Sequence, residues 1–192
     1  RIARKLGNAL VAPVVAYVPE GTIDPPTQHM RFPGTITVPP EVFRQTLESA
    51  AMSFALHGFK DVVFLGDHGG YQDDLKTVAD SLNRRWTASP ARAHYIAGYY
   101  GVTQTSYVAA LRRRGYSLAE IGTHAGLADT ALTLAIAPAM VRREALMTGA
   151  RHAPADGVHG DPRRASAALG ALGADAIVDE TTTAIEAAVR RP

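Results

Sequence analysis

The segment Val62–Gln72, VVFLGDHGGYQ, constrains the fold more than any other part of this chain. Four apolar residues lead directly into a glycine-rich turn, and a pattern with apolar residues at helical spacing follows. A near-continuous apolar run of this length is typical of a strand that is covered on both faces. The segment therefore predicts a strand, a tight turn and a helix in direct succession.

Short apolar runs alternate with helical patterns along the rest of the chain. Strands that alternate with helices indicate an α/β fold built on a parallel sheet. The sequence contains no internal repeat and no linker long enough to divide it, so we expect a single domain over residues 1–192. The expected strands cover residues 9–18, 35–38, 59–65 and 91–100, and the expected helices cover residues 2–6, 39–57, 72–86, 102–114, 129–138 and 165–191, the last with a break between Gly170 and Gly173.

Composition and charge exclude several classes of function. Lys and Arg number 20 against 18 Asp and Glu, and no aromatic residues interleave with the basic runs, which argues against nucleic-acid binding. The absence of cysteine excludes disulfides, thiolate metal sites and cysteine nucleophiles. No apolar stretch reaches the roughly 18 residues that a membrane span needs, and no G-x-S-x-G, Walker A or G-x-G-x-x-G motif occurs. The compartment stays open between the cytoplasm and an exported location.

The turn after the predicted strand carries the first candidate site. Asp67 and His68 follow the carboxyl end of the strand, where open α/β sheets bind their ligands. Imidazole and carboxylate are suitable ligands for zinc, manganese or iron. The backbone N–H groups of Gly69 and Gly70 are candidates to contact an anion or an oxyanion. The alternative is an ordinary strand–helix turn in which Asp67 caps the helix and His68 is merely exposed.

Three further loops contain histidines. His124 lies in the glycine-flanked stretch GTHAGLADT, although Asp129 before an apolar run is also an ordinary helix N-cap signal. His29 lies in a long proline-rich loop that also contains the carboxylate of Glu20, and such loops are usually functional or mobile. His159 lies in GVHGDPRR. Each of these histidines also fits an ordinary exposed loop.

Three of these loops, in this order and spacing, carry a family resemblance. HMRFPGT (His29–Thr35), GDHGGY (Gly66–Tyr71) and HAGLADT (His124–Thr130) resemble the motifs of the creatininase (creatinine amidohydrolase) family, and GDPRRAS (Gly160–Ser166) resembles a common C-terminal element of it. The resemblance implies an α/β fold of three layers, α/β/α, with a mostly parallel sheet. It also implies a divalent metal site, hydrolysis of amide bonds in small cyclic compounds, and assembly as a ring-like hexamer.

The resemblance also assigns roles to residues. By position, His68 corresponds to a metal-binding histidine, with Asp67 beside it as a second ligand or as a partner that orients the imidazole. His124 corresponds to a histidine assigned to proton transfer, and Asp129 stands where a glutamate is usual. The residues expected to contact the substrate are His29, Gly69, Gly70 and Tyr71.

The chain departs from the family pattern at the metal site. The family's E-x-H pair and a following aspartate, which supply most of the metal ligands, precede the point that corresponds to Arg1. Two-metal members carry a carboxylate where this chain has Gly70. We therefore expect these 192 residues to hold an incomplete site whose remaining ligands lie upstream of Arg1. Zinc is the expected metal, with manganese or iron as alternatives.

Two functions follow from this reading. The first is a metal-dependent amidohydrolase that acts on a small, cyclic amide, has neither nucleic acid nor membrane as a partner, and forms a homo-oligomer. The second is a non-catalytic protein that kept the creatininase fold for binding or assembly and lost its metal site. The two readings differ in whether the chain holds a metal and in whether a chelator abolishes turnover.

Overall fold

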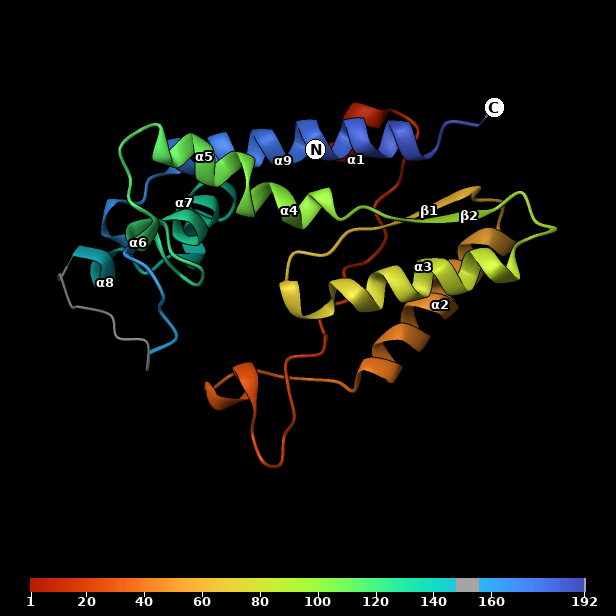
Figure 1. The fold of residues 1–192 in the computed structure, drawn as a ribbon, viewed down its shortest axis with the longest axis horizontal. Coiled ribbons are helices and arrows are strands. Elements are labelled where there is room, and N and C mark those ends of the chain that lie inside the picture. Colours follow the sequence, from red (N-terminus) through yellow and green to blue (C-terminus); the bar gives the residue numbers. More distant parts are fainter. Residues whose placement is uncertain (148–155, 192) are drawn as a thin grey trace. The chain divides into compact units, whose positions relative to one another are not determined.

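A computed structural model describes residues 1–147 and 156–191, and Figure 1 shows the course of the chain. The chain forms two compact units. Unit 1 comprises Arg1–Tyr100 together with the residues from Thr181 onward, and unit 2 comprises Gly101–Glu180. Each unit has a hydrophobic cluster of its own.

Unit 1 contains a small parallel sheet. Strand β1 (Asp61–Phe64) pairs with β2 (Arg92–Tyr95), and Val62 lies opposite Ala93 in the register. Helices α2 (Pro40–Leu56) and α3 (Gln72–Arg85) pack together on one side of the strands, and the C-terminal end of α9 (Ala167–Ala188) lies on the other (Figure 1). The strand–turn–helix succession that the sequence predicted is therefore confirmed.

The local sequence accounts for the helices of unit 1. The short α1 (Ile2–Leu6) ends at Gly7, whose φ of 79° is left-handed. Helix α2 begins at a proline, which is favoured in the first turn because it needs no N–H partner there. Helix α3 buries the apolar face that its spacing predicted, namely Leu75, Val78, Ala79 and Leu82, with Trp86 directly after it.

The predicted strand over residues 9–18 is wrong. This stretch has no regular secondary structure, and Val11 and Val14 are 78% and 86% exposed. The N–H of Val38 donates to the carbonyl of Val18 (3.3 Å), but the expected strand over residues 35–38 does not form either. An apolar run does not specify a partner strand by itself, and Pro13 lacks a donor for a ladder.

Unit 2 is helical in its described part. Its helices are α5 (Ser106–Arg112), α6 (Leu118–Ile121), α7 (Leu127–Ile136) and α8 (Arg143–Met147), together with most of α9 and the part of α4 (Gly98–Gln104) that follows Tyr100. Short 3₁₀ turns cover Pro138–Met140 and Pro162–Arg164. The core contains Tyr107, Leu111, Ile121, Leu127 and Ala131.

Two predicted helices of unit 2 differ from the structure. The helix expected over residues 102–114 is interrupted at Thr105, whose φ and ψ of −122° and −89° are not helical. Helix α9, by contrast, runs without a break through Gly170 and Gly173. A Cβ atom on Gly170 would lie 1.8 Å from the carbonyl oxygen of Ala131. The glycine therefore permits close packing of α9 against α7 and does not end the helix.

Within residues 1–147 and 156–191, none of the helices combines the length and the apolar character that crossing a bilayer requires.

Candidate functional site

His68 lies in the turn that follows β1, just before the 3₁₀ turn Gly69–Tyr71 that leads into α3. Its backbone is extended, with φ −130° and ψ 140°. The side-chain amide of Gln72 donates to the His68 carbonyl (2.6 Å) and accepts from the hydroxyl of Tyr95 (2.9 Å). This relay ties the histidine to the end of β2, so its position is set by the sheet.

Glu20 and His29 both lie in the proline-rich loop. The N–H of Glu20 donates to the hydroxyl of Thr37 (2.9 Å), and the N–H of His29 donates to the carbonyl of Glu20 (3.2 Å). The two side chains also meet, because Nδ1 of His29 lies 2.6 Å from Oε2 of Glu20. The loop is therefore folded back on itself through both backbone and side-chain contacts.

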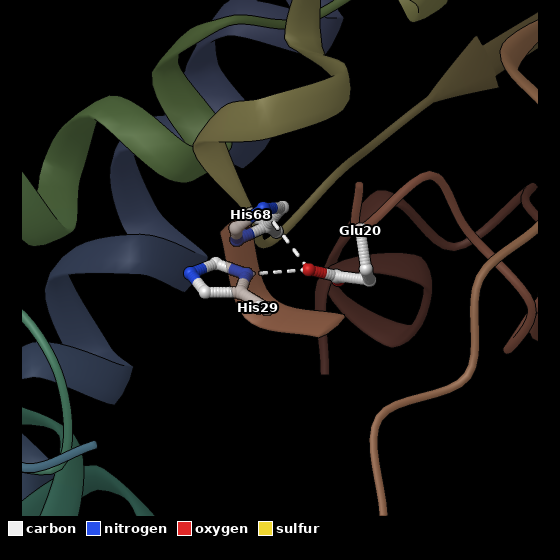
Figure 2. Close-up of side chains that lie close together, drawn as sticks. All are labelled: Glu20, His29 and His68. Carbon is white, nitrogen blue, oxygen red and sulfur yellow. Dashed lines mark hydrogen bonds and ion pairs between the residues drawn. The ribbon is translucent and has the colours of Figure 1, made fainter. Parts of the chain in front are cut away.

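The side chains of Glu20 and His29 from the proline-rich loop and of His68 from the turn after β1 converge at one point of unit 1 (Figure 2). Nε2 of His68 lies 3.5 Å from Oε2 of Glu20, and the two imidazole rings are 5.0 Å apart between centroids. One potential ligand atom from each residue lies within 4.8 Å of the other two, and all three residues are half-buried. We call this group the donor cluster.

The donor cluster suits a divalent metal. One carboxylate and two imidazoles form the kind of mixed oxygen and nitrogen set that zinc, manganese and iron accept. Donor atoms bound at about 2.0–2.1 Å to a tetrahedral zinc lie roughly 3.3 Å apart. The 3.5 Å between Glu20 and His68 is already near that value, whereas the 2.6 Å between Glu20 and His29 would have to lengthen. The residues thus fit a metal with small side-chain movements.

The cluster differs from the one that the sequence predicted. Two expected ligands were Asp67 and His68, with the others upstream of Arg1, yet the structure gathers three donors from within this chain. Glu20 was not among the predicted site residues, and His29 was predicted to contact the substrate. The only signal in the sequence for Glu20 was its place as a carboxylate in the same loop as His29.

Asp67 and Tyr71 contact each other. The hydroxyl of Tyr71 donates to Oδ1 of Asp67 (2.5 Å), and the N–H of Asp67 donates back to that hydroxyl (3.1 Å). Tyr71 is buried against Phe43, and its ring also lies 5.6 Å from that of His68. Burial, followed by the hydrogen bond to Asp67, raises the pKa of Tyr71 well above its usual value. The tyrosine therefore stays protonated and holds the turn.

Gly69 and Gly70 are both exposed. A Cβ atom on Gly70 would lie 2.6 Å from Nε2 of His68, whereas one on Gly69 would lie 3.1 Å from the hydroxyl of Tyr100. The imidazole that reaches Glu20 thus occupies the space that a side chain at position 70 would need. The His68 imidazole can therefore take this direction because position 70 is a glycine and not the carboxylate residue expected in two-metal members of the family.

Unit 2 contains the other predicted site residues. Asp129 lies in the first turn of α7 and His124 lies in the loop before this helix, and both residues are exposed. The N–H of Ala125, a residue with φ 50°, donates to Oδ2 of Asp129 (2.9 Å). Although Asp129 is exposed as a residue, the atoms around its carboxylate desolvate that group and raise its pKa, while the Ala125 hydrogen bond and the attraction to His124 oppose that rise. Asp129 therefore stabilises the loop that presents His124.

Comparison with known proteins places the chain. A family model described as creatininase, creatinine amidohydrolase, matches residues 1–185. The fold resembles a crystal structure of creatinine amidohydrolase (creatininase) with a TM-score of 0.79 and 21% identity, over 100% of this chain and 79% of that one. A manganese form of creatininase (TM-score 0.80, 20% identity) and a zinc–zinc form of a creatininase mutant (0.76, 19%) each align over 99% of this chain and 79% of theirs. A search of curated proteins found no match.

Proposed function

Because this chain belongs to the creatininase family, we propose that it is a metal-dependent amidohydrolase that opens a small, cyclic amide. The donor cluster is the observation that carries this proposal, because it offers a carboxylate and two imidazoles at one point of unit 1. Its half-buried position leaves it reachable by a small molecule while lowering the local dielectric constant, which strengthens electrostatic interactions there.

We propose that Glu20, His29 and His68 hold one divalent ion, with zinc as the first candidate and manganese as the second. Zinc–zinc and manganese forms among the structural neighbours support these two metals for proteins of this fold. A bound divalent metal lowers the pKa of a water molecule toward 7 and polarises a carbonyl group. The side chain of Glu20 supplies the anionic oxygen of the set, and the relay from Tyr95 through Gln72 keeps His68 in place for it.

The proposed proton donor is His124. An imidazole side chain can donate a proton to a leaving nitrogen at neutral pH, which is the role that histidine most often takes in acid–base catalysis. Asp129 attracts a protonated imidazole and fixes the loop through the N–H of Ala125, which helps keep His124 ready to donate. Both residues are exposed, so a substrate has access to them.

We assign supporting roles to the turn around His68. The backbone N–H groups of Gly69 and Gly70 are proposed to contact the substrate's oxygen as negative charge develops on it, since small residues leave that backbone accessible. Asp67 and Tyr71 are proposed to keep the turn in shape through their hydrogen bond. Direct ligation by Asp67 stays a prediction that D67N tests, because a ligand's loss lowers the bound metal whereas a loosened turn lowers it little.

The proposal is tested on the purified full chain. Its metal content is measured by mass spectrometry, and ring opening of creatinine, 2-pyrrolidinone and succinimide is assayed with and without a chelator. We expect bound zinc or manganese and turnover that the chelator abolishes and added metal restores. No bound metal and no chelator-sensitive turnover would instead support a non-catalytic binding or assembly protein. A mass measurement in solution tests the proposed homo-oligomer, for which a hexamer is expected.

A further inference from the structure

His159 contacts His124 although the two residues lie far apart in the sequence. The N–H of His159 donates to the carbonyl of His124 (2.8 Å), and the N–H of Thr123 donates to the carbonyl of His159 (2.8 Å). These bonds form an isolated antiparallel bridge between the loop before α7 and the loop before the 3₁₀ turn Pro162–Arg164. The two loops are therefore held together by direct backbone hydrogen bonds.

Glycines make this contact very close. A Cβ atom on Gly122 would lie 2.1 Å from the carbonyl oxygen of His159, and one on Gly160 would lie 2.6 Å from Cα of Gly126. Real Cβ atoms do not approach other atoms so closely, so no larger residue fits at these positions without a shift of the backbone. The glycines thus lock the two histidines beside each other.

The two imidazole rings lie edge to face. Their centroids are 5.7 Å apart and their planes make an angle of 75°. This is the arrangement that aromatic rings prefer, because the positive edge of one meets the negative face of the other. Both side chains are exposed, so the contact is made where an unrestrained histidine would sample several rotamers.

We propose that His159 is a positioning residue that fixes the ring plane of His124. The inference rests on the proposed function, in which His124 transfers a proton, since a donor is effective only when its N–H points at the accepting atom. His159 acts through the face and edge of its ring and does not itself exchange a proton with the substrate. An aromatic ring without nitrogen should therefore replace it.

Two variants separate this role from a simple effect on folding. H159A removes the ring, while H159F keeps a ring of similar size and removes its nitrogens. NMR spectra of the full chain with isotope-labelled histidine report the ring signals of His124, which H124A identifies by their disappearance. We expect the His124 signals to move toward those of a free, solvated histidine in H159A and to stay near their native positions in H159F.

Activity on the substrate of the panel that turns over gives a second readout. H159A should lower kcat about 10-fold with KM within about 2-fold, H159F should recover most of that loss, and neither should change the bound metal. Unchanged His124 signals in H159A, or equal displacement in H159A and H159F, would overturn the proposal whether or not turnover is found. If H124A leaves turnover intact, the proton-transfer role fails separately, while the spectra still decide whether His159 positions the ring.

Discussion

In unit 1, His29 and His68 meet Glu20 through side chains, whereas in unit 2 the backbones of His124 and His159 bond directly to each other. The first arrangement holds polar donor atoms close together, but their distances depend on rotamers and on protons. The second is set by glycine contacts that no rotamer change relieves. The donor cluster can therefore accommodate an ion by small side-chain movements, while the backbone contact between the two histidines of unit 2 keeps a fixed geometry.

The largest effect we expect is a loss of stability when a methyl group is added to a glycine at the backbone contact between His124 and His159. G122A places a Cβ 2.1 Å from the carbonyl oxygen of His159 at a residue with φ 71°. With a ψ of −177°, this backbone conformation is essentially restricted to glycine, so backbone strain and overpacking together should cost about 3 kcal/mol of unfolding free energy. The measurement is denaturant unfolding of the purified chain.

Gly115 offers the matched control for this variant. It has a similar φ of 85°, it also lies in unit 2, and a Cβ there would meet nothing within 4 Å. G115A should cost only about 1 kcal/mol, since it adds left-handed strain without a clash. Equal losses for G115A and G122A would show that the loops are not in close contact and would remove the basis of the comparison.

A side-chain-held cluster should instead lose its ligand while keeping its fold. H68A removes one of the three donors, so zinc affinity, measured by competition with a chelating dye, should fall by at least about 100-fold. The unfolding free energy without metal should change little because His68 is only half-buried. H57A is the control, as His57 is an exposed histidine at the end of α2, and its affinity for zinc should equal that of the native chain.

The direction of the His68 ring provides a finer test. G70A would put a Cβ 2.6 Å from Nε2 of His68 and should turn the imidazole away from Glu20, which lowers zinc affinity about 10-fold. G69A, in the same turn, would meet only the end of the Tyr100 side chain at 3.1 Å and should leave the affinity nearly unchanged. Equal zinc affinities in G70A and G69A would contradict the link between Gly70 and the direction of the His68 imidazole.

The smallest expected effect concerns pH and Asp129. Its pKa is raised in the folded chain, so the folded state binds this proton more tightly than the unfolded state. The ionised carboxylate then costs stability at neutral pH, and the cost disappears once both states are protonated in acid. D129N should accordingly be slightly more stable than the native chain at pH 7, by less than about 1 kcal/mol, and this advantage should vanish as the pH falls toward 3. A stability advantage of D129N that grows as the pH falls would contradict the raised pKa of Asp129.

The sequence was informative where function depends on local pattern. The apolar run into GDHGG placed His68 after a strand, as the structure has it. The glycines near His124 and His159 indicated loops in the sequence. Their role as contact points could not be predicted, because it depends on two distant segments of the chain lying against each other.

The donor cluster shows why the rest could not be predicted. Glu20 joins His29 because the proline-rich loop folds back, and both join His68 because that loop lies near the end of β1. Neither approach leaves a periodic signal in the sequence. For residues 9–18 the sequence prediction was wrong in the opposite direction. Their apolar composition indicated a strand, but the structure pairs them with no strand among the described residues.

The proposed function depends above all on the binding of one divalent metal by Glu20, His29 and His68. Anomalous diffraction from crystals of the zinc-loaded full chain, measured at the zinc absorption edge, tests it directly. We expect a single strong peak in unit 1, within about 2.0–2.2 Å of a carboxylate oxygen of Glu20 and of one nitrogen from each imidazole. A zinc peak bonded to His68 but to neither Glu20 nor His29, or no peak at this cluster, would contradict it.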